Sequence, residues 1–303
     1  MKVAVTGCHG FIGGHLCERL LVDGHHVMGI DHRDRPAWSR IDAVRLELGE
    51  PGSVAAAARA LSGCEAVFHL AARRPFSWEL GPLLAGNILR TSHLLQAMRL
   101  AGVPRLVHAS TVAVYGRAER LPIDEDTPPR PENAYQASKA QAEVLAEIVS
   151  RAGTDVTVLR TTSVFGGRER QSPMHSFLDA ARRGDPIRLF AGGKVRRDHV
   201  HVADVVDANL AALMSRGDPS YRVYNVASGE APAERDLAEV IFLVLGRRGQ
   251  IELGDDPDGP DHDWIVDISR ARASLGFSPR PLRERIAEFA ATLLRDQAKE
   301  ASP

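Results

Sequence analysis

The sequence predicts an α/β protein, with a Rossmann-like, doubly wound parallel sheet and a smaller C-terminal α/β substrate lobe. Three observations support this fold class. A glycine-rich turn joins a short apolar strand to a helix at the N-terminus, strand-like and helix-like segments alternate through the first half, and the alternation loosens after about residue 165. We expect a first domain over 1–164, which segments near 194–226 rejoin, and a substrate-binding lobe over 165–303.

The N-terminal segment has the order of elements that a dinucleotide pyrophosphate site requires. Residues 2–5 read as a short buried strand, residues 6–13 contain three glycines, and leucines at helical spacing follow over 14–22. Glycines let backbone amides approach phosphates, and the N-terminus of a helix carries partial positive charge. The first domain is therefore predicted to bind a dinucleotide.

An acidic residue follows the second expected strand, residues 27–30, and indicates which dinucleotide binds. Asp31 can accept hydrogen bonds from an adenosine ribose diol and would repel a 2′-phosphate, which favours NAD. Arg33 and Arg35 lie close enough to meet such a phosphate, so NADP stays an alternative at this point.

The remaining elements follow from periodicity and from glycine and proline breaks. Strands are expected at 44–48, 66–70, 105–109 and 156–159, and helices at 54–61, 87–100 and 135–151. The second half should hold helices at 174–183, 234–245 and 282–294, and strands at 198–202 and 223–226 that rejoin the first domain. Crossovers between the parallel strands should be right-handed.

Composition limits the class of protein. The chain has 303 residues, a formal net charge of −1 and three cysteines. We expect neither nucleic acid nor a membrane as partner, because the charge is balanced and no apolar run approaches about 18 residues. No charged leader with an apolar core precedes the first strand, and few cysteines suit a reducing compartment, so a cytoplasmic location is expected. The histidines lack ligand-like spacing, and no metal site is expected.

One tyrosine and one lysine stand out. Tyr135 is the only tyrosine followed by a lysine four residues later, Lys139. On a helix these two positions share a face. An ammonium beside a phenol favours the phenolate and lowers the phenol's pKa, which gives a group that can transfer protons near neutral pH.

The motifs together resemble the extended short-chain dehydrogenase/reductases, in particular the NAD-dependent nucleotide-sugar epimerase/dehydratase group, over almost the whole chain. The matching segments are residues 6–13, 69–72, 110–116, 135–139, 197–202, 224–229 and 267–277, with Asn87 as the helix asparagine. Each motif is modest, but their order and spacing are specific.

The resemblance implies a role for each matching residue. Tyr135 would be the acid/base on a sugar hydroxyl, Lys139 would hold the nicotinamide ribose and keep the phenol acidic, and Thr111 would donate a hydrogen bond to the same sugar oxygen. The implied cofactor-binding residues are Gly7, Gly10, Phe11, Ile12, Asp31, Glu47, Leu48, Leu70, Ala71, Ala72, Asn87, Ala109, Ser110, Tyr135 and Lys139.

Residues after the threonine narrow the chemistry that the resemblance implies. The 4,6-dehydratases carry Asp-Glu there and decarboxylating members a glutamate, whereas this chain has Val112 and Ala113. An NAD-dependent epimerase, acting at C4 through a keto sugar, is therefore expected. The alternative is an NAD(P)-dependent dehydrogenase or ketoreductase on a keto sugar or another alcohol. A non-enzymatic dinucleotide sensor is disfavoured, because it would not need the three proton-handling residues.

The expected substrate is a nucleotide-diphosphate sugar, although the chain departs from the group's pattern here. Ser163 stands where an asparagine usually contacts the diphosphate, and Pro257 and Pro260 fall on the charged positions of a later Arg-x-Gly-Asp motif. Arg197 is the diphosphate candidate, and Arg168 or Arg170 could substitute.

Two further expectations concern loop arginines and association. Arg73 and Arg74 are expected near the mouth of the pocket, unless they are only solvated loop residues. By the resemblance, the helices at 87–100 and 135–151 pair across a two-fold axis in a homodimer. The apolar face of that interface would come from Leu95, Met98, Val144 and Ile148, which could equally be core residues.

Overall fold

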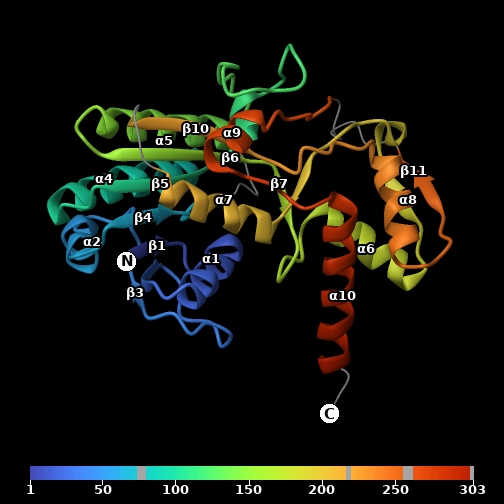
Figure 1. Ribbon diagram of the computed structural model, residues 1–303, viewed down its shortest axis with the longest axis horizontal. Helices are drawn as coiled ribbons and strands as arrows, with labels where there is room; N and C mark the ends of the chain where they lie inside the picture. Colours follow the sequence, from blue (N-terminus) through green and yellow to red (C-terminus); the bar gives the residue numbers. More distant parts are fainter. Residues whose placement is uncertain (74–79, 216–219, 255–261, 301–303) are drawn as a thin grey trace.

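The first lobe is built on a seven-stranded sheet. The structure, a computed structural model, describes residues 1–73, 80–215, 220–254 and 262–300. All seven strands are parallel (Figure 1). In spatial order they are β10 (Tyr221–Val226), β6 (Asp155–Thr161), β5 (Arg105–Thr111), β4 (Ala66–His69), β1 (Lys2–Thr6), β2 (His26–Asp31) and β3 (Ala43–Arg45).

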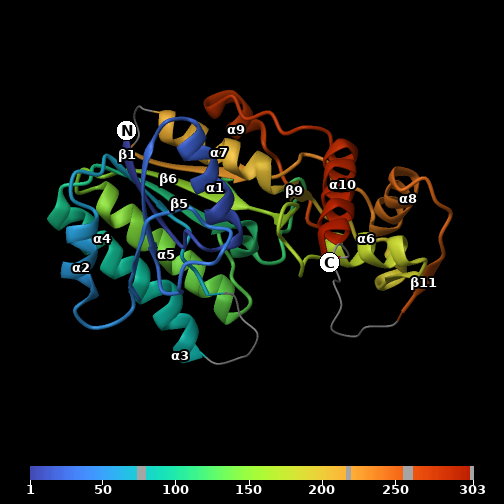
Figure 2. The same ribbon diagram turned by 90° about the horizontal axis from the view of Figure 1, so that it is seen from below.

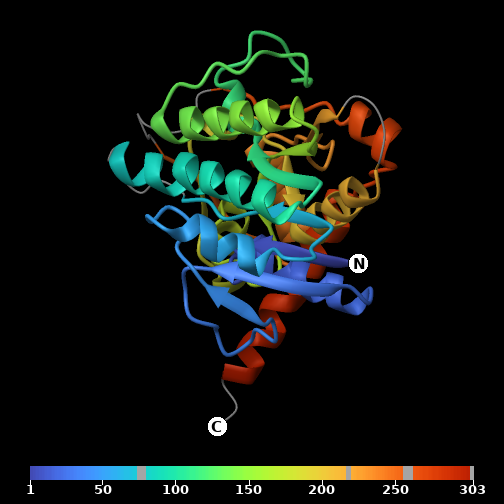
Figure 3. The same cartoon turned by 90° about the vertical axis from the view of Figure 1, so that its left-hand side faces the viewer.

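Helices cover both faces of this sheet, which confirms the predicted doubly wound fold. One face carries α2 (Ser53–Ala60), α4 (Arg90–Ala101) and α5 (Ala134–Ser150), and the other carries α1 (Phe11–Val22) and α7 (Val202–Met214) (Figure 2). When the left-hand side of Figure 1 faces the viewer, α2, α4 and α5 are seen side by side (Figure 3). The central strands are therefore buried on both faces, which explains their continuous apolar runs.

Several elements differ in detail from their expected bounds. The helix expected at 87–100 begins with α3 (Leu80–Leu83) and a π-helical segment, Leu84–Leu89, before α4. The third strand is shorter than expected. The segment expected as a strand at 198–202 forms β9 (His199–His201), which pairs with β7 (Ser163–Phe165) and not with the main sheet. The expected strand at 223–226, by contrast, becomes the edge strand β10.

The second lobe has its own small core. Two parallel strands, β8 (Ile187–Leu189) and β11 (Ile251–Leu253), lie with three helices beside the first lobe (Figure 1). The helices are α6 (Pro173–Arg183), α8 (Glu234–Val244) and α10 (Leu282–Glu300). Phe165, Ile241 and Phe289 are fully buried in this core. The division into domains at residue 164 stays a prediction.

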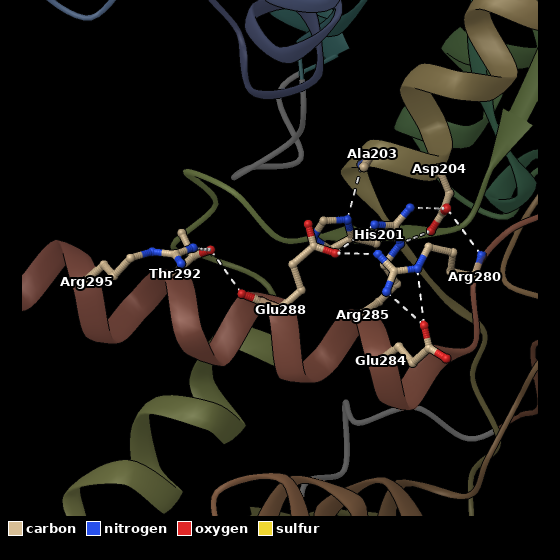
Figure 4. Close-up of polar contacts among 9 residues, drawn as sticks. All are labelled: His201, Ala203, Asp204, Arg280, Glu284, Arg285, Glu288, Thr292 and Arg295. Atoms are coloured by element: carbon tan, nitrogen blue, oxygen red, sulfur yellow. Dashed lines mark hydrogen bonds and ion pairs between the residues drawn. The ribbon is translucent and has the colours of Figure 1, made fainter.

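A buried ion pair fastens α10 to the start of α7. Arg285 donates hydrogen bonds to both carboxylate oxygens of Asp204, one of them 2.9 Å long, and a further bond of 2.7 Å to Glu288 (Figure 4). Both members of the Asp204–Arg285 pair have side chains that are at least 93% buried, with exposures of 3% and 7%. Since an unpaired buried charge is costly, this contact fixes where the last helix lies.

No helix in the described ranges is long and apolar enough to cross a membrane. No cluster of three or more His, Cys, Asp or Glu side chains within the same ranges could hold a metal ion.

Candidate active site

A cleft of about 890 Å³ opens where the first lobe meets the second. The carboxyl ends of β1, β4 and β5 form one wall, which is where open α/β sheets bind ligands. Of the residues predicted for the site, the cleft is lined by Gly7, Gly10, Phe11, Ile12, Leu70, Ala72, Arg73, Ala109, Ser110, Thr111, Tyr135, Lys139, Ser163 and Arg197. A smaller adjoining pocket is lined by Gly7, Gly10, Asp31, Glu47, Leu48, Leu70, Ala71 and Ala72. Asn87 lines neither.

The glycine turn at the start of α1 is closely packed. Gly7 has a φ of +71°, which favours glycine. A Cβ at Gly10 would lie 2.9 Å from the Gly7 carbonyl oxygen, and a Cβ at Gly13 only 2.1 Å from it. Gly10 is the N-cap of α1 and has no side chain that could accept hydrogen bonds. The backbone amides in the first turn of α1 therefore keep their capacity to bind an anion. These features fit a pyrophosphate.

Asp31 is buried at the end of β2, 4% exposed, and its carboxylate is fully engaged. It accepts hydrogen bonds from the amides of His9 (2.9 Å) and Arg33 (3.0 Å) and two bonds of 3.1 Å from the Arg33 guanidinium. Arg33 is therefore paired with Asp31 and does not form a free fork for a 2′-phosphate. A ribose diol could bind this carboxylate only in place of the Arg33 guanidinium.

The residues predicted at the adenine have other partners in the structure. The Glu47 carboxylate forms an ion pair with Arg90 of α4 and accepts the Gly49 amide at 3.0 Å. Leu48 is 2% exposed, and its carbonyl accepts a hydrogen bond from the Ser53 hydroxyl. This pairing of Arg90 could not be predicted from local sequence patterns, because Glu47 lies 43 positions away.

Asn87 connects its own helical segment to the loop after β4 and to α5. Its side chain accepts from the Arg73 amide at 2.8 Å, donates to the Arg73 carbonyl and donates to the Ser138 hydroxyl at 2.8 Å. It therefore holds the loop after β4 against α5, one residue from Lys139. Arg73 lines the cleft, whereas Arg74 lies outside the described residues.

The three predicted catalytic residues come from two elements that meet at the cleft. Thr111 ends β5, and its hydroxyl oxygen accepts the Ala113 amide at 3.2 Å. Tyr135 and Lys139 lie one turn apart on α5, which begins after an Asn133 side-chain cap. All three side chains line the same cleft. The Asn133 cap fixes where α5 begins, and the four-residue spacing puts the two α5 residues on one face.

Lys139 is only 5% exposed, and its ammonium donates a hydrogen bond of 2.6 Å to the Ala109 carbonyl. Burial lowers the pKa of the ammonium to about 8, while the negative charge of Glu143 acts in the opposite direction. Burial, and secondarily the charge of Lys139, also lowers the pKa of His69 to about 3 and that of His108 well below its usual value. Both imidazoles are therefore neutral, and Lys139 is charged at neutral pH.

The substrate side of the cleft holds one arginine of the expected kind. Arg197 lines the cleft, its side chain is 30% exposed, and its Nε lies 3.9 Å from Glu234. Ser163, on β7, is exposed in the cleft wall. Arg168 instead binds Glu18 and lies over the Trp38 ring, with its guanidinium carbon 4.1 Å from the ring centroid.

The described part of the cleft wall contains neither Arg170 nor the two prolines of the later motif. Arg170 donates hydrogen bonds to the carbonyls of Gly167 and Glu169 and does not line the cleft. Pro257 and Pro260 lie outside the described residues. The cleft wall also includes Glu169 and Trp264, which no motif indicated.

Comparisons with known proteins agree with this geometry. The family model described as "NAD dependent epimerase/dehydratase family" matches residues 3–227. A UDP-glucose 4-epimerase of Mycolicibacterium smegmatis is 32% identical, over 95% of this chain and 97% of its own. A dTDP-4-dehydro-6-deoxy-D-allose reductase of a Streptomyces species is also 32% identical, over 95% and 94%.

Solved structures are similar over nearly the whole chain. MoeE5 in complex with UDP-glucuronic acid and NAD is 32% identical, with a TM-score of 0.86 and coverage of 98% of this chain and 100% of that one. The similarity therefore includes both lobes and the cleft between them.

Proposed function

The chain belongs to the NAD-dependent epimerase/dehydratase family, and we propose that it is an NAD-dependent nucleotide-sugar epimerase that inverts C4 through a keto sugar. The observation that carries this proposal is one cleft lined by Thr111, Tyr135 and Lys139 beside the glycine turn of α1. Relatives and similar solved structures that are named as UDP-sugar 4-epimerases support it.

Tyr135 would exchange the proton of the sugar hydroxyl. Its phenolate would remove that proton as the carbinol is oxidised, and the phenol would return it when the keto group is reduced from the opposite face. NAD, when bound, accepts the hydride and gives it back. The sugar must turn over between the two transfers, which requires loose contacts to the sugar and firm contacts to the nucleotide.

Lys139 and Thr111 would assist this proton transfer in different ways. The Lys139 ammonium, fixed to the Ala109 carbonyl, would favour the Tyr135 phenolate electrostatically and hold the nicotinamide ribose. The Thr111 hydroxyl would donate a hydrogen bond to the same sugar oxygen, where negative charge develops.

The remaining predicted residues would hold the cofactor. The first-turn amides of α1 would bind the pyrophosphate, and Asp31 would accept the ribose hydroxyls in exchange for the exposed guanidinium of Arg33. Leu70, Ala71 and Ala72, together with Ala109 and Ser110, would form the wall along the dinucleotide, and Asn87 would act by holding the loop after β4. Arg197, Ser163 and Arg73 would face the diphosphate sugar.

Cleft residues argue against the other reactions of the family. Val112 and Ala113 line the cleft directly after Thr111, and neither side chain can exchange a proton. A dehydratase or a decarboxylating enzyme needs an additional acid or base at these positions. The reductase alternative keeps a specific support, since a dTDP-sugar reductase is among the relatives.

Epimerase and reductase are separated by cofactor balance. The purified protein should convert UDP-glucose to UDP-galactose, observed by proton NMR, without added cofactor and without net consumption of NADH or NADPH. The same assay with dTDP-glucose ranks the nucleotides. Stoichiometric consumption of reduced cofactor with a keto sugar, and no interconversion of epimers, would favour the reductase.

We also propose a cytoplasmic homodimer that binds no nucleic acid. Leu95 and Met98 of α4 are core residues, at 7% and 2% exposed, so they cannot form the expected interface. Val144 and Ile148 of α5 are exposed by 47% and 55% and would supply its apolar part. Light scattering at micromolar concentration tests this, and a monomer mass would contradict it.

A further inference from the structure

A buried ion pair lies behind the residues of α5 that line the cleft. The Glu143 carboxylate, 4% exposed, accepts hydrogen bonds from Arg160 of β6, the shortest of 2.7 Å from Nη2. It also accepts a hydrogen bond from the hydroxyl of Ser110 on β5. The guanidinium carbon of Arg160, itself 5% exposed, lies 4.7 Å from the centroid of the Tyr115 ring. The Glu143–Arg160 pair thus joins α5 to β5 and β6.

Stability alone is a poor explanation for this pair. Replacing a buried ion pair by well-packed apolar residues is often neutral or stabilising, because two charges must be desolvated to form it. The position of Glu143 suggests another reason. It lies one helical turn after Lys139, on the same side of α5, and its hydrogen-bond donor Ser110 lies between Ala109, which binds the ammonium, and Thr111.

We propose that the Glu143–Arg160 pair is a positioning device for the reaction: Glu143 is the counter-charge of the buried Lys139 ammonium, and Arg160 fixes that carboxylate against the end of β5. The pair acts through Lys139 and Ser110 and touches neither substrate nor cofactor. This inference extends the proposed function, since it assigns the reaction two residues that do not line the cleft.

The other titratable groups around Lys139 cannot take over this part. His69 of β4 and His108 of β5 stay neutral, because burial holds the pKa of each imidazole far below neutrality. Tyr115, in the 3-10 turn that packs on α5, stays neutral because burial raises the pKa of its phenol to about 12. Arg90 of α4 is paired with Glu47. Tyr135 is the proton-transfer group itself, so among the described residues packed around the ammonium Glu143 supplies the negative charge.

The proposal predicts opposite effects for the two members of the pair. Glu143→Gln removes the counter-charge and leaves a second buried cation, so the pKa of Lys139 should fall by about one unit. Arg160→Met leaves Glu143 with Lys139 as its nearest cation, so the same pKa should rise. Glu147→Gln is the matched control on the next turn of α5, because its pair with Arg151 is exposed (41% and 74%) and it should cause no shift.

The measurement is an NMR titration of the protein without cofactor, labelled with ¹³C at lysine Cε. The chain has only four lysines, and the signal missing from Lys139→Met identifies Lys139. The wild-type signal should titrate near pH 8. This readout does not depend on turnover, so it tests the pair even where the wild-type protein proves not to be an epimerase.

A second readout connects the pair to the reaction. In Glu143→Gln the alkaline fall of kcat/KM should move to lower pH and kcat should decrease about tenfold, with KM for the nucleotide sugar unchanged. Shifts of the same sign in Glu143→Gln and Arg160→Met, or no shift in either, would overturn the proposal.

Variants that fail to fold do not end the test. The double variant Glu143→Leu with Arg160→Leu replaces the pair by apolar side chains and should keep the wild-type melting temperature. Its Lys139 signal should still titrate at a lower pH than the wild-type signal, because the double variant lacks the Glu143 charge that raises the pKa of Lys139. A folded double variant with the wild-type titration would equally overturn the proposal.

Discussion

The ammonium of Lys139 donates a hydrogen bond of 2.6 Å to the carbonyl oxygen of Ala109. This bond ties the first half of α5 to the end of β5, two residues before Thr111. The positive charge is thereby fixed at the carboxyl edge of the sheet, on the helix face that also carries Tyr135. A buried ammonium with one backbone partner loses part of its basicity, and a pH dependence results.

Activity should fall as the pH rises through about 8, because deprotonation of Lys139 removes the charge that favours the Tyr135 phenolate. The contribution of Lys139 to the stability of the fold changes with pH in the opposite direction. Between about pH 8 and pH 10.5 the unfolded chain holds a proton that the folded chain lacks, so this lysine's contribution to the free energy of unfolding rises with pH. A pH profile of kcat/KM checks the first statement, and a flat profile to pH 10 would refute it.

Tyr135→Phe removes the proton-transfer group and leaves the shape of the cleft nearly unchanged. We expect kcat to fall by about 10²–10⁴-fold, because no other phenol lines the cleft among the described residues. Cofactor content after purification should match the wild type, and Tyr221→Phe on the edge strand β10 serves as control. A wild-type rate in the Tyr135 variant would remove this residue from the mechanism.

Gly13→Ala should weaken both the fold and cofactor binding. The added Cβ would lie 2.1 Å from the carbonyl oxygen of Gly7, so the glycine turn must shift, at a cost of about 1–3 kcal/mol. Gly81→Ala makes the same change where nothing beyond the chain neighbours and the helix's own backbone lies within 4 Å of the added Cβ, and it should leave the melting temperature and NAD content unchanged. Equal behaviour of the two variants would show that the turn is not closely packed.

Asp204→Asn should destabilise the protein by at most about 3–5 kcal/mol, because it removes the buried carboxylate partner of Arg285 and leaves only the 43%-exposed Glu288 to compensate the charge. The matched control is Glu284→Gln, on the same helix α10. The ion pair between Glu284 and Arg280 is about half exposed and should contribute at most about 1 kcal/mol to stability. Urea unfolding followed by circular dichroism measures both, and a small loss in Asp204→Asn would mean that α10 is held by apolar contacts alone.

The fold was largely predictable because its signals are local. The glycine turn, the capped α5 and the apolar central strands each follow from neighbouring residues, and the doubly wound sheet follows from their alternation. Local periodicity could not predict the π-helical segment Leu84–Leu89 or the pairing of β9 with β7, since both depend on how distant segments pack. The sequence left open whether Val144 and Ile148 are interface or core residues, and the structure exposes both, while Glu143 of the same helix is buried.

The site was predictable for residues in contiguous motifs only. The family resemblance assigned Thr111, Tyr135 and Lys139 to one site, and all three line one cleft of the structure, while their roles stay predictions. The side-chain partners of several predicted residues could not be found this way. The pairing of Arg33 with Asp31 depends on side-chain rotamers, and the pairing of Arg90 with Glu47 depends on how distant segments pack. The Glu143–Arg160 pair joins a helix to a strand and becomes visible only when the sheet is assembled.

In the proposed reaction, hydride leaves C4 of the sugar and returns to the same carbon. This transfer can be followed with UDP-glucose that carries deuterium at C4, incubated with the purified protein in ordinary water without added cofactor. We predict that the UDP-galactose formed keeps its deuterium at C4, as observed by NMR and mass spectrometry. Loss of the label to solvent during epimerisation would contradict hydride transfer, and a complete lack of epimer would contradict the assigned activity.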